Sequence, residues 1–386
     1  MLKLIKNAEV YTPQPIGRQD ILIADEKIVR VAPEITGYDK LPDVEVLDAG
    51  GKRLAPGFID LHVHVTGGGG EQGPASRVPE IRLSELVEAG VTTVLGLLGT
   101  DGTSRSVENL LYKTKALRQE GITAFMLTGS YQYPSVTITG DVIRDIALID
   151  ECVGAKVALS DHRSSNLTQQ ELIRLASDVR MGGLISGKAG LLVMHMGSGK
   201  QMLELIRRAL EETEIPAKTF LPTHVGRNDR LIDDAIAFAK CGGVFDLTGD
   251  QEQTAAHSCG RYIRRALDAG VSIDHITLSS DGCGSMPRFD ENGECIGLTY
   301  STPGVLLKEL RWAVQHEGIA LETALAVVTS TPAKVLAQSG RKGCIAPGAD
   351  ADMVIFDEDL HITSVLARGK LARWERKTLM RGTFEA

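Results

Sequence analysis

The sequence predicts a protein of the α/β class, a (β/α)8 TIM barrel joined to a small β-sandwich domain that both chain ends build. Three observations predict this fold. Strand-like and helix-like segments alternate from residue 55 to residue 344, whereas the two ends contain only short β-prone runs. Polar side chains able to bind metal also recur where the predicted barrel strands end, which is where such barrels carry their active sites.

The two chain ends form the predicted sandwich. Each end holds a few short runs rich in β-branched and other apolar residues, and neither shows a helical pattern. Because each end is too small to bury a core alone, we assign residues 1–54 and 345–386 to one domain. Its predicted strands are residues 2–5, 21–23, 28–31, 44–47, 352–356, 362–368 and 371–374.

The middle of the chain, residues 55–344, forms the predicted barrel. Strand-like runs are each followed by a helix-like segment, and eight such units favour a closed parallel barrel. The predicted strands are residues 57–65, 91–98, 122–127, 156–160, 191–195, 219–224, 243–247 and 276–280. The predicted helices are residues 83–89, 104–119, 142–149, 169–179, 200–211, 231–240, 260–269, 304–315 and 321–328.

The first barrel strand carries two histidines, His62 and His64, in the sequence PGFIDLHVH. Residues two apart on a strand share one face, so the two imidazoles point the same way. A pair of this kind can bind one metal ion, because neutral imidazole is a good ligand for zinc and its neighbours. Two histidines satisfied by ordinary hydrogen bonds remain the alternative when this pair is considered alone.

Further polar residues accompany the later strands. Tyr131 follows strand three, His195 and His224 end strands five and six, and Asp281 follows strand eight. Lys156 is the exception, because it begins strand four as predicted, although the limits of such a short strand are uncertain by a few residues. Four histidines, one lysine and one aspartate would converge on one face of the barrel, a far more specific signal than any one of them.

Composition and charge exclude several classes of function. The chain has 386 residues, 43% hydrophobic and 24% charged, as in ordinary globular proteins. Its 42 basic and 50 acidic residues give a net charge of -8, which offers no global field for nucleic acid or an anionic membrane. It has no apolar run of membrane-spanning length and no CxxC pair. We therefore expect a cytoplasmic protein with small-molecule partners, and neither a nucleic-acid nor a membrane partner.

Motifs over essentially the whole chain resemble the amidohydrolase superfamily and, within it, the isoaspartyl dipeptidase family. The HxH pair with later His and Asp residues marks only the superfamily, whereas the glycine-glutamate loop, SDHRS and the spacing of His224 and Arg227 are similar to the dipeptidases. Gly226 and Ser198 depart from the family pattern, which has larger polar and acidic residues there. The matching motifs are PGFIDLHVH (56–64), GGGGEQGP (67–74), LLGT (97–100), LTGSY (127–131), AKVALSDHRS (155–164), HMG (195–197), PTHVGRN (222–228), SSDGCGS (279–285) and CIAPGADADMVI (344–355).

The resemblance implies a site for two divalent metal ions, zinc being the expected metal. The implied ligands are His62, His64 and Asp281 at one ion, His195 and His224 at the other, and Lys156 as a carbamate formed with carbon dioxide that bridges both. Carbamate formation requires a neutral amine, which burial and nearby positive charge favour. Asp281 would also carry a proton to the leaving nitrogen, and Tyr131 would donate a hydrogen bond to the developing oxyanion.

The resemblance also implies a substrate, a β-aspartyl dipeptide, and a homo-oligomeric assembly with an octamer as one candidate. Such a dipeptide presents one ammonium and two carboxylates. Glu71 would bind the ammonium, and Arg163 and Arg227 would bind carboxylates through their planar guanidinium groups. The residues implied to add further hydrogen bonds are Gly69, Thr100 and Ser285.

Two other functions remain open at this stage. Another amidohydrolase, such as a dihydroorotase, hydantoinase or N-acyl-amino-acid deacylase, would use the same metals but has less reason for Glu71 with two arginines. A non-catalytic scaffold on this fold tends to lose metal ligands, and here all six are present. Metal analysis distinguishes the scaffold from the enzymes, and a panel of substrates distinguishes the enzymes from one another.

Overall fold

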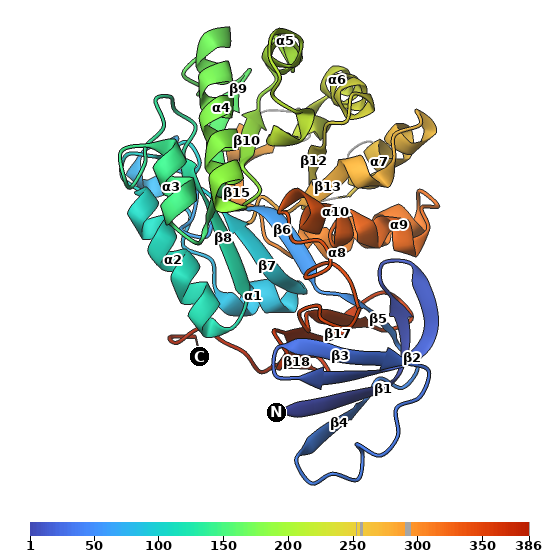
Figure 1. Ribbon diagram of the computed structural model, residues 1–386. Coiled ribbons are helices and arrows are strands. Elements are labelled where there is room, and N and C mark those ends of the chain that lie inside the picture. Colours follow the sequence, from blue (N-terminus) through green and yellow to red (C-terminus); the bar gives the residue numbers. More distant parts are fainter. Residues whose placement is uncertain (252, 255–257, 290–294, 386) are drawn as a thin grey trace.

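A ring of strands with helices outside it forms the larger part of the molecule, and a mixed sheet packs at one end of that ring (Figure 1). The computed structural model describes residues 1–251, 253–254, 258–289 and 295–385. In this part of the chain the amidohydrolase-like barrel predicted from the sequence is present, with parallel strands and helices in alternation.

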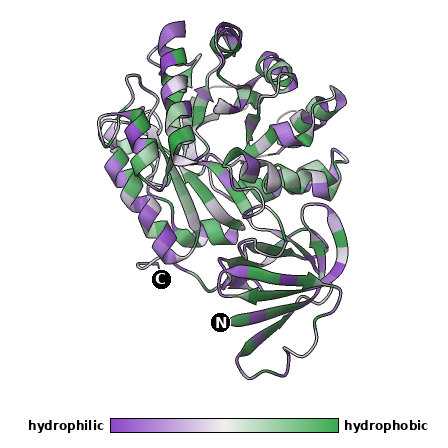
Figure 2. Cartoon of the chain, viewed as in Figure 1, coloured by the Kyte–Doolittle hydropathy of each residue, from purple (hydrophilic) through white to green (hydrophobic). Residues whose placement is uncertain are grey.

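Eight parallel strands make up the ring in the described residues. Each contains a run of buried apolar side chains, and these strands appear mostly hydrophobic in Figure 2, while the surrounding helices carry hydrophilic residues. Val94, Leu110 and Met126 are buried in one core cluster that joins neighbouring strands to the helix between them. The strands are β6 (Phe58–Val63), β7 (Val91–Gly96), β8 (Thr123–Gly129), β9 (Cys152–Leu159), β10 (Leu191–Met196), β11 (Phe220–Thr223), β12 (Phe245–Thr248) and β13 (Ile276–Ser279).

Each barrel strand is followed by a helix, as predicted, with boundaries that differ from the prediction by a few residues. The largest difference is in α4, which continues to Ser186 because Gly187 supplies the left-handed residue that ends it. The helices are α1 (Leu83–Glu88), α2 (Val107–Glu120), α3 (Val142–Leu148), α4 (Gln169–Ser186), α5 (Glu204–Glu212), α6 (Asp229–Lys240), α7 (Cys259–Asp268), α8 (Val305–Gln315), α9 (Leu321–Ala326) and α10 (Ser330–Val335), with the 3-10 turns η1 (Pro74–Ser76), η2 (Ala217–Thr219), η3 (Val225–Arg227) and η4 (Ile273–His275).

Strands from both chain ends join in one mixed sheet. Strand β5 continues directly toward β6 and pairs with β16 from the other end of the chain, so the two ends are tied together. The pairing agrees with the expectation that the ends associate, while the sandwich form and the exact domain limits stay predictions. The strands are β1 (Leu2–Tyr11), β2 (Pro15–Ala24), β3 (Lys27–Ala32), β4 (Val44–Asp48), β5 (Arg53–Pro56), β16 (Met353–Phe356), β17 (Ile362–Ala367), β18 (Lys370–Trp374) and β19 (Lys377–Thr378).

Two features of the barrel differ from the sequence prediction. Strand β9 begins at Cys152, four positions before its predicted start, because the apolar run before Lys156 continues the strand. Lys156 therefore lies inside the strand and not at its beginning. An antiparallel pair of strands, β14 (Ser285–Phe289) and β15 (Cys295–Tyr300), also follows β13 and was not predicted.

In the described residues we find no helix that is both long and apolar enough to cross a bilayer.

Candidate active site

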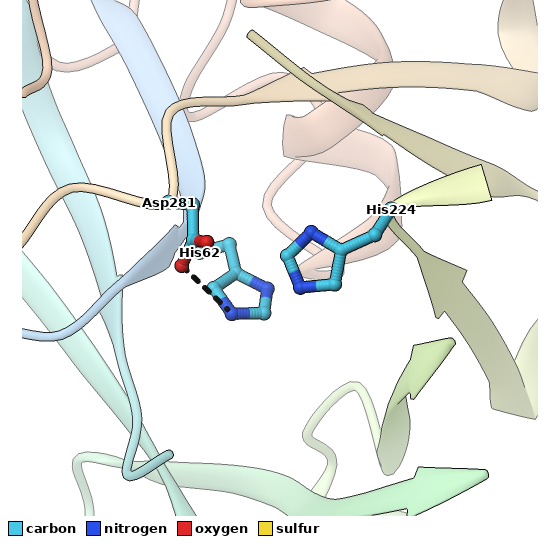
Figure 3. Close-up of side chains that lie close together, drawn as sticks. All are labelled: His62, His224 and Asp281. Atoms are coloured by element: carbon cyan, nitrogen blue, oxygen red, sulfur yellow. Dashed lines mark ion pairs between the residues drawn. The ribbon is translucent and has the colours of Figure 1, made fainter. Parts of the chain in front are cut away.

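Three side chains at the carboxyl edge of the barrel lie close enough to share one metal ion (Figure 3). They are His62 of β6, His224 after β11 and Asp281 after β13, and one nitrogen or oxygen atom of each lies within 4.8 Å of the others. Asp281 Oδ1 is 3.5 Å from His62 Nε2 and 3.1 Å from His64 Nε2. Two or three imidazoles with one carboxylate are a ligand set suited to zinc.

The donor atoms of this cluster fit a metal ion, because several of them have no other partner. Among the described residues, His62 Nδ1, His64 Nδ1, His224 Nε2 and Asp281 Oδ1 are buried without a hydrogen bond. Such atoms are rare in folded proteins and call for an explanation. Burial, followed by the charge of Lys156, holds the pKa of His62 well below its usual value, so the ring is neutral, as a metal ligand must be.

Lys156 contacts the same cluster from β9. Its side chain is completely buried, and Nζ lies 3.1 Å from His62 Nε2. Burial lowers the pKa of Lys156 to about 7, although the attraction of Asp281 opposes this shift. A large fraction of the amine is therefore neutral near pH 7, and the neutral amine is the form that can react with carbon dioxide.

His195 lies beside His224, with the two ring centroids 4.6 Å apart, but its own nitrogens already have partners. Tyr131 Oη is 2.6 Å from Nδ1, and Asp161 Oδ2 is 2.9 Å from Nε2. To bind a metal ion, His195 would have to exchange one of these contacts, so its role as a ligand stays a prediction. Burial raises the pKa of Tyr131 well above its usual value, which keeps its hydroxyl protonated as a donor.

Four of the residues predicted to bind substrate meet in what we call the Glu71 cluster, formed by Glu71, Thr100, Arg163 and Ser285. Glu71 Oε1 accepts hydrogen bonds from Thr100 Oγ1 at 3.2 Å and Arg163 Nη1 at 3.3 Å. Ser285 Oγ lies 3.0 Å from both carboxylate oxygens. Glu71, Thr100 and Arg163 come from three separate loops and Ser285 begins β14, so only the folded chain brings these residues together.

Gly69 belongs to the loop that carries Glu71. Its φ is +76°, and a Cβ atom there would lie 2.3 Å from the carbonyl oxygen of Ser76. Only glycine fits both the left-handed conformation and the close approach of the two backbone segments. The glycines before Glu71 therefore shape the loop that presents its carboxylate.

Arg163 connects the Glu71 cluster to the histidines. Its guanidinium donates to both oxygens of Asp161 at 2.9 Å, and Nη2 lies 3.1 Å from His195 Nε2. Although burial alone would raise it, the pKa of Asp161 is held well below its usual range by hydrogen bonds from Arg163 and His195. Asp161 is thus an anion that orients one arginine and one histidine of the site.

Arg227 borders two cavities beside the cluster, one of about 230 Å³ and one of about 690 Å³. Gly226 lines the smaller cavity, where a Cβ atom would lie 3.1 Å from the ring of Tyr262, so that ring fills the space of a larger residue at position 226. Ser198 lines the larger cavity. Both departures from the family pattern therefore line cavities of the site, and the smaller cavity is also lined by His224 and Asp281.

Four residues that were not identified from the sequence lie beside the predicted ligands or beside residues adjacent to them. Thr248 Oγ1 lies 2.7 Å from His224 Nδ1, which leaves Nε2 as the nitrogen of that ring without a hydrogen bond among the described residues. Asp161 holds His195 and Arg163 as described. Asp60 and Asp246 are buried carboxylates directly below the strand ends. Only Asp60, two positions before His62 on the same face of a strand, had a sequence signal that could have identified it.

The comparisons with known proteins agree with this geometry. The solved structure of the β-aspartyl dipeptidase from Fervidobacterium islandicum AW-1, in complex with a β-Asp-Leu dipeptide, is 42% identical to this chain and covers 98% of both chains with a TM-score of 0.90. The model of the amidohydrolase family matches residues 257–383.

Other matches are more distant. A dihydroorotase from Staphylococcus aureus is 34% identical over 108 residues, which are 28% of this chain and 24% of that enzyme. The chain therefore matches about a quarter of the length of that curated relative. The dihydropyrimidinase from Brevibacillus agri has a TM-score of 0.62 at 17% identity, covering 99% of this chain and 97% of that one, a likeness that concerns the fold alone.

Proposed function

Because this chain belongs to the β-aspartyl dipeptidase family of the amidohydrolase superfamily, we propose that it hydrolyses β-aspartyl dipeptides to aspartate and a second amino acid. The observation that carries the proposal is the Glu71 cluster beside the histidines. A carboxylate held by Thr100, Arg163 and Ser285 offers an ammonium group an anionic partner, and the neighbouring arginines offer partners for carboxylates.

Two divalent ions, proposed to be zinc, complete the site. The ligands would be His62, His64 and Asp281 for one ion, His195 and His224 for the second, and the carbamate of Lys156 between them. When bound, the ions would lower the pKa of water and polarise the scissile carbonyl. The orphaned nitrogens of the histidines and the lowered pKa of Lys156 support this assignment.

The side chains of this site divide the remaining work. Asp281 takes a proton from the attacking water and delivers it to the leaving nitrogen, since it lies beside both histidines of β6. The protonated hydroxyl of Tyr131 donates a hydrogen bond to the carbonyl oxygen as negative charge develops on it. Glu71 holds the ammonium of the aspartyl residue, while Arg163 and Arg227 bind carboxylates and fix the peptide bond in place.

This arrangement distinguishes the two isomers of an aspartyl peptide. In the β-linked isomer the free ammonium and carboxylate share a carbon one methylene away from the scissile carbonyl. In the α-linked isomer that carboxyl carbon is itself the scissile centre, so a site that binds both charged groups cannot also present the bond for hydrolysis. Leaving a charged partner unpaired costs about 1–3 kcal/mol, so the α-isomer should react about 5- to 150-fold more slowly.

We also propose a homo-oligomer, with an octamer as one candidate, a cytoplasmic location, and a β-sandwich domain comprising residues 1–54 and 345–386 beside a barrel of residues 55–344. The paired strands from both chain ends support this domain division.

A substrate panel tests the function. The purified enzyme, loaded with zinc, is assayed on β-Asp-Leu, α-Asp-Leu, N-acetyl-β-Asp-Leu and dihydroorotate, with zinc content measured in parallel. We expect β-Asp-Leu to be hydrolysed fastest. Equal rates on the α- and β-isomers, or faster cleavage of the acetylated peptide, would contradict the proposal in favour of a general deacylase, and hydrolysis of dihydroorotate alone would favour the dihydroorotases.

A further inference from the structure

The ring of barrel strands is not closed by backbone pairing at two places. In the described residues, strands β6 to β11 pair in one continuous sheet, and β12 pairs with β13. No ladder of backbone pairs joins β11 to β12 or β13 to β6 in this part of the chain. Beyond the strands, a single bridge between Val63 and Gly282 joins the second pair. Both gaps lie where the chain passes into a predicted metal ligand, His224 after β11 and Asp281 after β13.

Both of these ligands have strained backbones. The φ angle of His224 is +63° and that of Asp281 is +53°, in the left-handed region that residues other than glycine rarely adopt. Such conformations persist only where the surroundings hold them, and they gather at functional sites. Something other than the strand ladder must therefore hold these two positions.

At the first gap, the buried carboxylate of Asp246 on β12 holds the neighbouring strands. Its Oδ2 accepts a hydrogen bond of 2.7 Å from Thr223 Oγ1, the last residue of β11 and the one before His224. On the other side, Thr277 Oγ1 donates to Oδ1 at 2.7 Å and Ser279 Oγ to Oδ2 at 2.5 Å. One side chain thus joins three strands just below the site.

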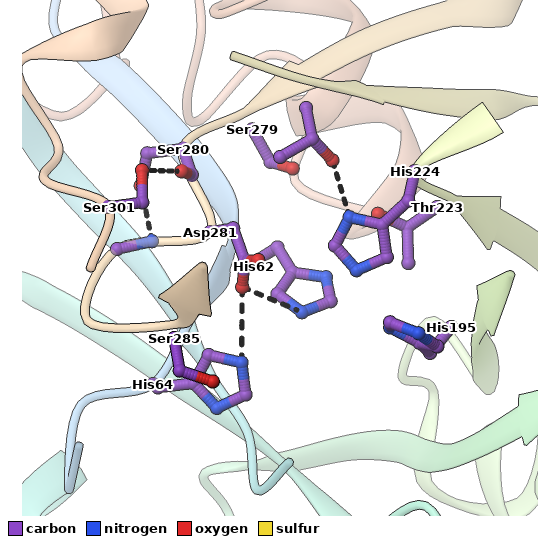
Figure 4. Close-up of polar contacts among 12 residues, drawn as sticks. His62, His64, His195, Thr223, His224, Ser279, Ser280, Asp281, Ser285 and Ser301 are labelled. Carbon is purple, nitrogen blue, oxygen red and sulfur yellow. Dashed lines mark hydrogen bonds and ion pairs between the residues drawn. The ribbon is translucent and has the colours of Figure 1, made fainter. Parts of the chain in front are cut away.

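At the second gap, the buried carboxylate of Asp60 on β6 has the same function. Ser280, the residue before Asp281, donates its backbone N–H to Oδ1 at 3.1 Å and its hydroxyl to Oδ2 at 2.5 Å. Ser280 Oγ also accepts a hydrogen bond of 2.9 Å from the backbone N–H of Gly282, on the far side of the ligand. Figure 4 shows Thr223 and Ser280 directly beside the ligands that follow them.

We propose that Asp60 and Asp246 are positioning residues of the metal centre, which close the two gaps in the barrel and thereby fix Asp281 and His224 in the left-handed conformations that aim them at the metal. The proposal rests on the proposed function in that it needs metal ions at this site. Asp246 binds Thr223, the residue before His224. Asp60 binds Ser280, the residue before Asp281, and its Oδ1 also accepts a hydrogen bond of 3.3 Å from the backbone N–H of His62, a predicted ligand.

The other explanation is that these carboxylates only stabilise the barrel. The two explanations predict different effects on metal binding when a hydroxyl group that binds Asp246 is removed. Thr223 is adjacent to a ligand, whereas Thr277 is four residues away from one. Both threonines are completely buried, and each donates one hydrogen bond of 2.7 Å to the same carboxylate. The variants Thr223→Val and Thr277→Val therefore remove equal interactions at unequal distances from the metal centre.

The experiment measures zinc affinity of the full chain after removal of bound metal, by competition with a chromophoric chelator, and the melting temperature of the metal-free protein. We expect both variants to lower the melting temperature to a similar extent. Thr223→Val should weaken zinc binding at least about 10-fold, as changes in the surroundings of metal ligands usually do, whereas Thr277→Val should stay within about twofold of the unmodified chain. Thr223→Ser, which keeps the hydroxyl, should restore the affinity.

Equal zinc affinities for Thr223→Val and Thr277→Val would refute the role of Asp246. If the valine variants do not fold, the pair Thr223→Ala and Thr277→Ala gives the same comparison. The positioning role of Asp60 is tested separately with Ser280→Ala, and an unchanged zinc affinity in this variant would refute that role. Should the unmodified chain bind zinc but fail to hydrolyse β-Asp-Leu, the proposed function would be wrong, while these comparisons would still decide the roles of Asp60 and Asp246.

Discussion

Replacing Glu71 by glutamine removes the negative charge that a substrate ammonium requires while it preserves the shape of the site. Glu71 Oε1 accepts hydrogen bonds from Thr100, Arg163 and Ser285, whereas Oε2 accepts only from Ser285. A glutamine can therefore keep its carbonyl oxygen toward the three donors and place its amide group on the other side. The loss of activity should thus report the charge rather than a collapse of the loop.

The size of the effect follows from the exposure of this carboxylate. A hydrogen bond to a charged group contributes about 1.5–3 kcal/mol. The Glu71 side chain is 24% exposed, so solvent weakens the interaction and the lower part of that range applies. A loss of about 1.5–2 kcal/mol lowers kcat/KM about 10- to 30-fold. We expect this decrease for Glu71→Gln on β-Asp-Leu.

The assay compares two substrates and two variants. N-acetyl-β-Asp-Leu has no ammonium, so its kcat/KM should change little in Glu71→Gln, and the preference for the free peptide should narrow about 10-fold or more. Glu80 is a matched control in the same loop, because its carboxylate pairs with Lys113 at 3.4 Å. If Glu71→Gln and Glu80→Gln behave alike, or if the variant loses equal activity on both substrates, Glu71 does not bind the ammonium.

Three further changes test other parts of the site. Lys156→Ala should abolish activity and reduce zinc to fewer than two ions per chain, with partial rescue by a short carboxylic acid; normal zinc content and rate would exclude the carbamate. Asp281→Asn keeps a ligand oxygen but cannot carry a proton, so turnover should fall about 10²- to 10⁴-fold with little loss of zinc, and a change of only a few fold would remove its catalytic role. Burial raises the pKa of Glu309 from 4.5 to about 6, so its protonated form stabilises the folded state below pH 4.5 and this contribution is lost as the pH rises through about 6. In denaturant unfolding of the metal-free chain, the decrease in unfolding free energy between pH 4 and pH 7 should therefore be about 2 kcal/mol smaller for Glu309→Gln than for the unmodified chain, and identical pH profiles would contradict this role.

The sequence by itself predicted the barrel and the candidate metal ligands, because these features depend on local periodicity and on single chemical groups, whereas the substrate contacts were predicted only from the family resemblance. Alternating strand-like and helix-like segments indicated the barrel without any knowledge of contacts, since the two periods are set by backbone geometry. His62, His64 and Asp281 could be named because each follows or ends a strand, and parallel strands of a barrel place such residues at one edge.

The tertiary structure alone decided which of these groups interact. It placed Lys156 inside β9 against His62 and gave both nitrogens of His195 to Tyr131 and Asp161. It also assembled the Glu71 cluster from three loops and the start of β14. It also revealed Asp246, which acts across a gap between strands that are neighbours in space. No local pattern encodes such contacts, because a hydrogen bond between distant segments depends on the packing of the whole barrel and not on the residues adjacent in the chain.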